Sequence, residues 1–159
     1  FENLAATGGI AADRLLFLPQ GRNDAENQSR YRLVDVVLDP MPFGNVNGTI
    51  EPLAMGVPVV TLVGRRHGER TSYSMLANLG VTSTVAQSGR DYVEIAVRLA
   101  EDESFMRETR EAIAARLPSS LLADGAAYAR NLEAAYLTAL AQKAPEALES
   151  AGVAPPVVS

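Results

Sequence analysis

The sequence predicts an α/β domain built on a doubly wound parallel sheet. Short apolar runs rich in β-branched residues recur along the chain, and segments with a helical spacing of apolar residues alternate with them. Glycine and proline stand between these segments, where the chain changes from one kind of element to the other. Ligands of such sheets bind beyond the carboxyl ends of the strands, so the loops that follow the strands are the first candidates for a site.

The first half of the chain is expected to hold three strands and three helical segments. Leu4–Ile10 ends one helix, Arg14–Leu18 is the first strand, and Asp24 to Leu33 is a short polar helix capped by Asn23 or Asp24. The next strands are Asp35–Leu38 and Val59–Leu62, and the helix between them is capped by Asn47 or Thr49 and ends at Gly56.

The second half is expected to be mainly helical. It holds helices at Arg70–Leu79, at Arg90–Ala100 and from a Ser104 cap to about Leu117, with a short strand at Thr82–Ala86. A last helix, from about Ala126 to Gln142, has apolar residues at intervals of four on a face that we interpret as core or interdomain packing: Tyr128, Leu132, Tyr136 and Leu140. The stretch 143–159 is predicted to be a flexible tail, so the domain spans residues 1–142.

Length and composition favour one domain that is a piece of a longer protein. The chain has 159 residues and opens with FENLAATGG, which we interpret as the end of a helix that begins before Phe1. A net charge of −5 argues against nonspecific nucleic-acid or anionic-membrane partners, and no run approaches the roughly 20 apolar residues of a membrane span. The absence of cysteine excludes disulfides and fits a cytoplasmic location.

The stretch Leu33–Leu62, LVDVVLDPMPFGNVNGTIEPLAMGVPVVTL, carries the clearest candidate site. A buried strand ends at Asp39-Pro40, because proline cannot extend a central strand. The helix that follows would present free N–H groups and the positive end of its dipole, which favour a phosphate or pyrophosphate. The loop between strand and helix is rich in residue types that let a backbone approach a ligand closely: Gly44, Asn45, Asn47 and Gly48.

Glu51 lies in the first turn of this helix, within reach of ribose hydroxyls, for which a carboxylate is an acceptor-only partner. An acidic residue at this place also complements the helix dipole in a purely structural turn. The chain has no G-x-G-x-x-G after a strand, so it does not carry the dinucleotide fingerprint. From the residues alone, a nucleotide-phosphate site and a structural turn both stay open.

The segment Gly64–Ser74, GRRHGERTSYS, is the second candidate. Its cations suit an anionic ligand such as a diphosphate, and Thr71 and Ser72 add hydroxyl donors. A solvated loop with a helix-capping threonine explains the same residues, and a single loop histidine is more often a surface residue than a catalyst. The scattered carboxylates and one histidine give no metal-ligand spacing, so neither a metal nor a cofactor is expected. The basic residues are Arg65, Arg66, His67 and Arg70.

The block Asp39–Gly64, DPMPFGNVNGTIEPLAMGVPVVTLVG, resembles the donor-nucleotide segment of the O-GlcNAc transferase family, including its bacterial and SPINDLY-type members. The sub-motif PFGNVNG followed by Glu51 is also similar to the bacterial cytoplasmic N-glycosyltransferases related to that family. The resemblance runs from about Asp13 to about Tyr136. It implies a Rossmann-like domain, the C-terminal half of a GT-B glycosyltransferase, which binds the UDP part of a UDP-sugar.

The resemblance also implies roles for individual residues. At the helix start, Asn47, Gly48 and Thr49 match residues that contact the diphosphate, and Glu51 matches the acidic residue that binds the ribose. The loop after the first predicted strand matches the one that lies against uracil, and two arginines match basic positions near the phosphates. The implied donor-binding set is Gln20, Gly21, Arg22, Arg30, Asn45, Asn47, Gly48, Thr49, Glu51 and Arg70.

Two histidines of the family are absent from this chain. One stands shortly before Arg30 in the family, where this chain has Glu26-Asn27-Gln28. The other stands beside the helix start in animal members, where this chain has Val46 and Asn47. The second departure favours the bacterial branch over the animal one.

The implied reaction is attack by a Ser or Thr hydroxyl of an acceptor protein on the anomeric carbon of a sugar, N-acetylglucosamine first of all, with UDP leaving and without a metal. The catalytic base, the N-terminal GT-B half and any tetratricopeptide repeats would lie outside this chain, which alone would be inactive. Three alternatives stay open: a UDP-glucose-dependent transferase that modifies asparagine, a GT-B nucleotide-sugar epimerase, and a non-catalytic interaction module that kept the fold and lost the donor.

Overall fold

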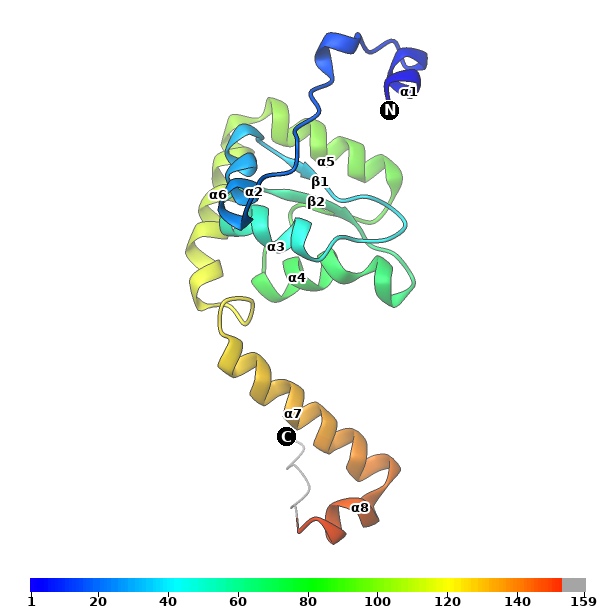
Figure 1. Cartoon of the computed structure of the whole chain (residues 1–159), viewed down its shortest axis with the longest axis vertical. Coiled ribbons are helices and arrows are strands. Elements are labelled where there is room, and N and C mark those ends of the chain that lie inside the picture. Colours follow the sequence, from blue (N-terminus) through cyan, green and yellow to red (C-terminus); the bar gives the residue numbers. More distant parts are fainter. Residues whose placement is uncertain (153–159) are drawn as a thin grey trace.

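The computed structural model describes residues 1–152, which form an α/β core with a helical extension at each end (Figure 1). Its sheet has three parallel strands in the order β1 (Val37–Leu38), β2 (Val59–Leu62) and β3 (Val85–Ala86). Val37 lies opposite Val59, and Thr61 lies opposite Val85. Because the strands are parallel, the loops that follow them leave the sheet at the same edge.

Helices bury β2 on both faces. On one face, α3 (Asn47–Ala54) and α4 (Thr71–Leu79) form a buried cluster with Val59. On the other face, α5 (Gly89–Glu101) packs against Val60, and α6 (Glu103–Arg116) contributes a residue to each cluster. Val59 and Val60 are consecutive, and consecutive strand residues point to opposite faces of a sheet. The predicted doubly wound, Rossmann-like α/β fold is therefore confirmed.

The remaining elements surround or extend this core. Five are short helical segments before α5, one is a 3-10 turn after α6, and two form the C-terminal extension. Their bounds are α1 (Glu2–Thr7), η1 (Ala12–Arg14), α2 (Asp24–Ser29), η2 (Arg30–Leu33), η3 (His67–Glu69), η4 (Leu117–Ser119), α7 (Gly125–Lys143) and α8 (Pro145–Ser150). The helices predicted for the second half of the chain lie close to their predicted bounds. Within the described residues, no helix combines the length and the apolar character that a membrane crossing requires.

The predicted first strand, Arg14–Leu18, is wrong. Arg14 belongs to η1, and none of the three strands pairs with the residues after it. Leu16 is 81% exposed and Phe17 is 61% exposed. The composition of this segment suits a strand, but a strand requires a neighbour for its backbone hydrogen bonds, and the described chain offers none here.

The cap predicted for α6 is also wrong, because Asp102 rather than Ser104 precedes the helix. The Asp102 Oδ1 accepts the Phe105 N–H at 3.0 Å and the Ser104 hydroxyl at 2.6 Å. These two contacts, the hydroxyl first, lower the pKa of Asp102 to about 2. A carboxylate that takes two donors at a helix start is a better cap than the hydroxyl two residues later.

The C-terminal extension differs from its prediction in two ways. α7 buries no residue, and its predicted packing face is exposed at Tyr128 and Tyr136 (Figure 1). The face is therefore not part of the core of the described chain, and interdomain packing stays a prediction. α8 occupies the first part of the predicted tail and buries Leu148. The rest of that tail, 153–159, lies outside the described residues.

Candidate functional site

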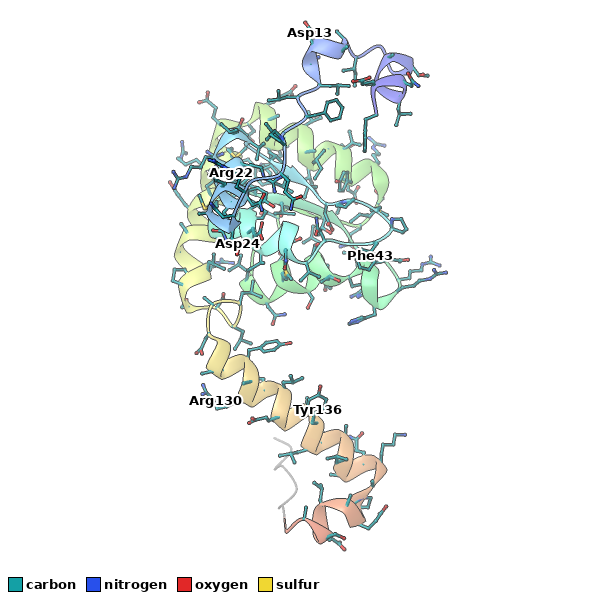
Figure 2. The ribbon with its side chains drawn as sticks, in the orientation of Figure 1. Asp13, Arg22, Asp24, Phe43, Arg130 and Tyr136 are labelled. Carbon is teal, nitrogen blue, oxygen red and sulfur yellow. The ribbon has the colours of Figure 1, made fainter. Side chains whose placement is uncertain are left out.

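Two loops meet at the carboxyl edge of the sheet. One joins β1 to α3, and the other joins β2 to α4. The Gly44 N–H donates to the carbonyl of Gly68 at 3.1 Å, and the Phe43 ring lies against Gly68. Figure 2 shows Phe43 on the first loop, at the end of the sheet away from Arg22 and Asp24. The parallel sheet thus brings together the two segments that the sequence singled out.

The first loop is anchored by Asp39, which directly follows β1 and is 4% exposed. Its Oδ1 accepts the backbone N–H of Asn45 at 2.9 Å, and its Oδ2 accepts the Thr61 hydroxyl at 2.7 Å. From α5, the Tyr92 hydroxyl donates to the Asp39 carbonyl at 2.9 Å. Burial, and then the negative charge of Asp39, raise the pKa of Tyr92 above its usual value.

The start of α3 is held by Asn45, and neither Asn47 nor Thr49 caps it as predicted. Val46 precedes the helix, and its apolar side chain makes no cap hydrogen bond. The Asn45 Oδ1 instead accepts the Gly48 N–H at 3.3 Å. A Cβ at Gly48 would lie 2.1 Å from the Asn45 Nδ2, so glycine is required for this close approach. The N–H groups of Val46 and Asn47 have no backbone or side-chain acceptor among the described residues.

Thr49 points inward from α3 and is fully buried. Its hydroxyl donates to the Asn45 carbonyl at 2.9 Å and lies 2.8 Å from the Ser72 hydroxyl. Ser72, which is also buried, donates to the same carbonyl at 3.1 Å. The sequence suggested that both hydroxyls donate to a ligand. In this structure they donate instead to the loop before α3, one from α3 and one from α4.

Glu51 is half-buried on α3 and lies beside Tyr31 of η2. Burial raises the pKa of the Tyr31 phenol, the negative charge and side-chain contact of Glu51 raise it further, and the positive charge of Arg30 opposes them. The Arg30 Nε donates to the Asn27 carbonyl at 3.0 Å, which holds this arginine at the end of α2. Two residues of the predicted set, Glu51 and Arg30, thus act on the same tyrosine.

The predicted uracil loop, Gln20 to Arg22, is held against α2. The Gly21 N–H donates to the Asn27 Oδ1 and the Arg22 N–H donates to the Glu26 Oε2, both at 2.8 Å. The Arg22 guanidinium pairs with the same carboxylate and lowers the pKa of Glu26. Among the described residues, no hydrogen bond or ion pair joins this loop to α3. The structure therefore holds this loop through α2, and among the described residues no hydrogen bond or ion pair links it to Glu51.

The basic loop is shaped by Glu69, whose Oε2 accepts the N–H groups of Arg65 and Arg66 at 2.9 and 3.2 Å. These two donors, Arg66 first, lower the pKa of Glu69. The Arg65, Arg66 and His67 side chains are exposed. Arg70 differs from them, because its guanidinium donates to the Gly64 carbonyl at 3.0 Å and stacks on the Tyr73 ring at 4.7 Å.

A cavity of about 740 Å³ extends from this loop between α4 and α7, with His67, Arg70 and Tyr73 at one end and Tyr128 and Leu132 on the other side. Figure 2 shows Arg130 and Tyr136 on α7, outside the α/β core. Arg70 therefore lines this cavity, and its own loop contacts the β1–α3 loop through Gly68. No group of three His, Asp or Glu residues with a metal-binding arrangement occurs among the described residues.

Three residues were not identified from the sequence as parts of a site: Asp39, Tyr31 and Asn27, which is a partner of the predicted uracil loop. A signal existed for Asp39, since it is the acid that ends an apolar strand run and precedes a glycine-rich loop. No comparable signal marks Tyr31 or Asn27, because their roles depend on how α2 and η2 fold back toward other segments.

Comparisons with known proteins support one family. The model of glycosyl transferase family 41 matches residues 1–132. The chain is 34% identical over 128 residues to the probable UDP-N-acetylglucosamine–peptide N-acetylglucosaminyltransferase SPINDLY of Solanum lycopersicum, covering 80% of this chain and 14% of the relative. It is 32% identical over 126 residues to the UDP-N-acetylglucosamine–peptide N-acetylglucosaminyltransferase of Caenorhabditis elegans, covering 79% of this chain and 11% of the relative.

The structure is similar to that of a mutant O-GlcNAc transferase from Thermobaculum terrenum, with a TM-score of 0.76 and 31% sequence identity. The match covers 85% of this chain and 26% of that one. The chain thus spans only a small part of the length of the relatives it matches. The matched part nevertheless contains both loops and the whole sheet, and the chain therefore belongs to glycosyl transferase family 41.

Proposed function

We propose that this chain is the donor-binding part of a protein glycosyltransferase that uses a UDP-sugar. The observation that carries the proposal is the start of α3, where two N–H groups that have no acceptor among the described residues lie one turn before the half-buried Glu51 carboxylate. A helix start of this kind suits a diphosphate, and a carboxylate suits the two hydroxyls of a ribose. The proposed sugar is N-acetylglucosamine, which the relatives' names give together with a peptide acceptor. The proposed acceptor group is a Ser or Thr hydroxyl.

Each residue has a distinct role in this proposal. Asn47 and Gly48 bring the backbone to the diphosphate, and Glu51 binds the ribose. Arg30 and Arg70 supply positive charge as UDP leaves, because a diphosphate leaving group gains negative charge in the transition state. Asn45 and Thr49 hold the loop in place, and Gln20, Gly21 and Arg22 form the surface for uracil. In this proposal the N-terminal half of the same parent protein, with its tetratricopeptide repeats, supplies the base and the acceptor site.

The transfer reaction is tested with the full-length parent protein, UDP-N-acetylglucosamine or UDP-glucose, and peptides that contain Ser, Thr or Asn. We expect UDP release together with N-acetylglucosamine on Ser or Thr, detected by mass spectrometry, and loss of both in Glu51→Ala. Glucose on Asn would establish the N-glycosyltransferase instead, an alternative that the resemblance of PFGNVNG to such enzymes keeps open. Conversion of the free UDP-sugar to its epimer without a peptide product would indicate an epimerase. A folded parent that binds no UDP would support the non-catalytic interaction module.

A further inference from the structure

The Asp39 carboxylate is a buried charge with an unusual set of partners. It is 4% exposed, and none of the ion pairs among the described residues includes it. A buried charge without a counter-ion is costly unless hydrogen bonds satisfy it. Both of its oxygens are satisfied, one by the Asn45 N–H and one by the Thr61 hydroxyl. The carboxylate therefore connects the β2 strand to the loop before α3.

The hydrogen bond from the Asn45 N–H to Asp39 matters because Asn45 makes most of the hydrogen bonds that hold the loop before α3. Its carbonyl accepts the Thr49 and Ser72 hydroxyls, and its side chain accepts the Gly48 N–H. Every polar group of Asn45 except its amide NH₂ is thus engaged, and the Asp39 contact fixes the backbone N–H. The next two N–H groups, of Val46 and Asn47, have no acceptor among the described residues. Asp39 holds the peptide that contains the Asn45 N–H, and the Thr49 and Ser72 hydroxyls hold the next peptide, which carries the Val46 N–H. Together these contacts set the direction of the chain from which the two donors project.

We infer that Asp39 is a positioning residue for donor binding, which acts by fixing the Asn45 peptide so that the next N–H groups are presented to the diphosphate. This inference rests on the proposed function. Asp39 does not touch the ligand and acts through Asn45. A carboxylate is suited to this position because both oxygens are acceptors, and the two neighbouring groups are both donors.

The inference is tested by UDP calorimetry on the full-length parent protein with two substitutions of Asp39. Asp39→Ala removes both hydrogen bonds, and we expect UDP to bind at least about tenfold more weakly, which is the scale of a lost charged hydrogen bond. Asp39→Asn can still accept the Asn45 N–H while its NH₂ group donates to Thr61, whose hydroxyl is also an acceptor. We expect Asp39→Asn to restore the UDP affinity to within about threefold of the wild type.

Two matched variants remove the other hydrogen bonds of Asp39 and keep the one to Asn45. Thr61→Val deletes the hydroxyl on β2, and Tyr92→Phe deletes the hydroxyl from α5. We expect both to lower the melting temperature but to leave the UDP affinity within about twofold of the wild type. If they weaken UDP binding as much as Asp39→Ala does, or if folded Asp39→Ala binds UDP normally, the inference is overturned.

A measurement on the wild type covers the case in which Asp39→Ala does not fold. Hydrogen exchange without ligand should show a slower amide at Asn45 than at Val46 and Asn47, because only Asn45 donates to a buried carboxylate. Equal exchange at the three amides would refute the anchoring role. The proposed function fails separately, if the wild-type parent binds no UDP at all.

Discussion

The phenol of Tyr31 lies beside the carboxylate of Glu51, so the residue proposed to bind ribose has a partner from a distant segment. Tyr31 belongs to η2 and Glu51 to α3. Burial and then the Glu51 charge raise the pKa of Tyr31. The hydroxyl therefore remains protonated at neutral pH and is a donor toward Glu51.

Tyr31→Phe should weaken UDP binding about twofold to tenfold, which is less than the loss of a direct charged hydrogen bond to the ligand because Tyr31 acts only through Glu51. The reason is that Glu51 loses the neighbour that orients it. Calorimetry on the full-length parent measures the effect, and Tyr136→Phe on exposed α7 is the matched control. An unchanged affinity in Tyr31→Phe would show that Glu51 is oriented without the tyrosine.

Stability should fall in alkaline solution through Tyr31 and Tyr92, whose pKa values are raised in the folded state, in each case by burial first. A raised pKa means that the folded state favours the neutral phenol. This contribution is complete below the unfolded pKa of about 10 and is lost as pH rises through the folded pKa. Melting temperatures between about pH 8 and 11 should decline less steeply in Tyr92→Phe than in the wild type. Equal slopes would contradict the prediction.

Arg70→Ala should weaken the binding of UDP about tenfold, the scale of a lost charged contact, and the binding of uridine by less than about twofold. The proposed contact is with phosphate, which uridine lacks. Arg66→Ala is the control, because this guanidinium is exposed and lies 3.9 Å from Glu69. A similar loss for both ligands would mean that Arg70 acts only through the loop it holds at Gly64.

Gly21→Ala should disrupt the loop predicted to lie against uracil. A Cβ at Gly21 would lie 2.7 Å from the Asn27 backbone nitrogen and 2.8 Å from the Glu26 Cβ, so the loop must move. We expect weaker binding of both UDP and uridine. Gly89→Ala is the control, since a Cβ at Gly89, the first residue of α5, meets no atom within 4 Å. Normal uridine binding in Gly21→Ala would exclude the loop from the base site.

The sequence predicted the β1–α3–β2 unit well because each of its boundaries has a local cause. Val59 and Val60 belong to a run buried on both faces, and Gly56 with positive φ follows the end of α3. The strand predicted at Arg14–Leu18 was wrong because a strand requires a neighbouring strand, which its own residues do not specify. The α6 cap failed because Asp102 and Ser104 are both good cap residues, and their hydrogen bonds decide between them.

The sequence predicted every residue of the candidate site as a ligand contact. In the structure, some of these residues are buried and support the loop, and others remain accessible. Thr49 has the right residue type for a phosphate contact, but helical periodicity turns it into the core beside Ser72. Glu51, two positions later on α3, stays half-buried and accessible. The long-range contacts of Tyr31 and Asp39 could not be derived from spacing, since they join segments that meet only after the sheet has formed.

The most direct test of a donor site on α3 is calorimetric titration of UDP into the full-length parent, with AMP as the control ligand. We expect UDP to bind and AMP not to bind. Glu51→Ala should weaken UDP binding by about 1–3 kcal/mol, the range for a charged hydrogen bond. Glu94→Ala, at an exposed position on α5, should leave UDP binding unchanged. Absence of UDP binding by the folded parent, or equal affinity in Glu51→Ala, would contradict the proposed site.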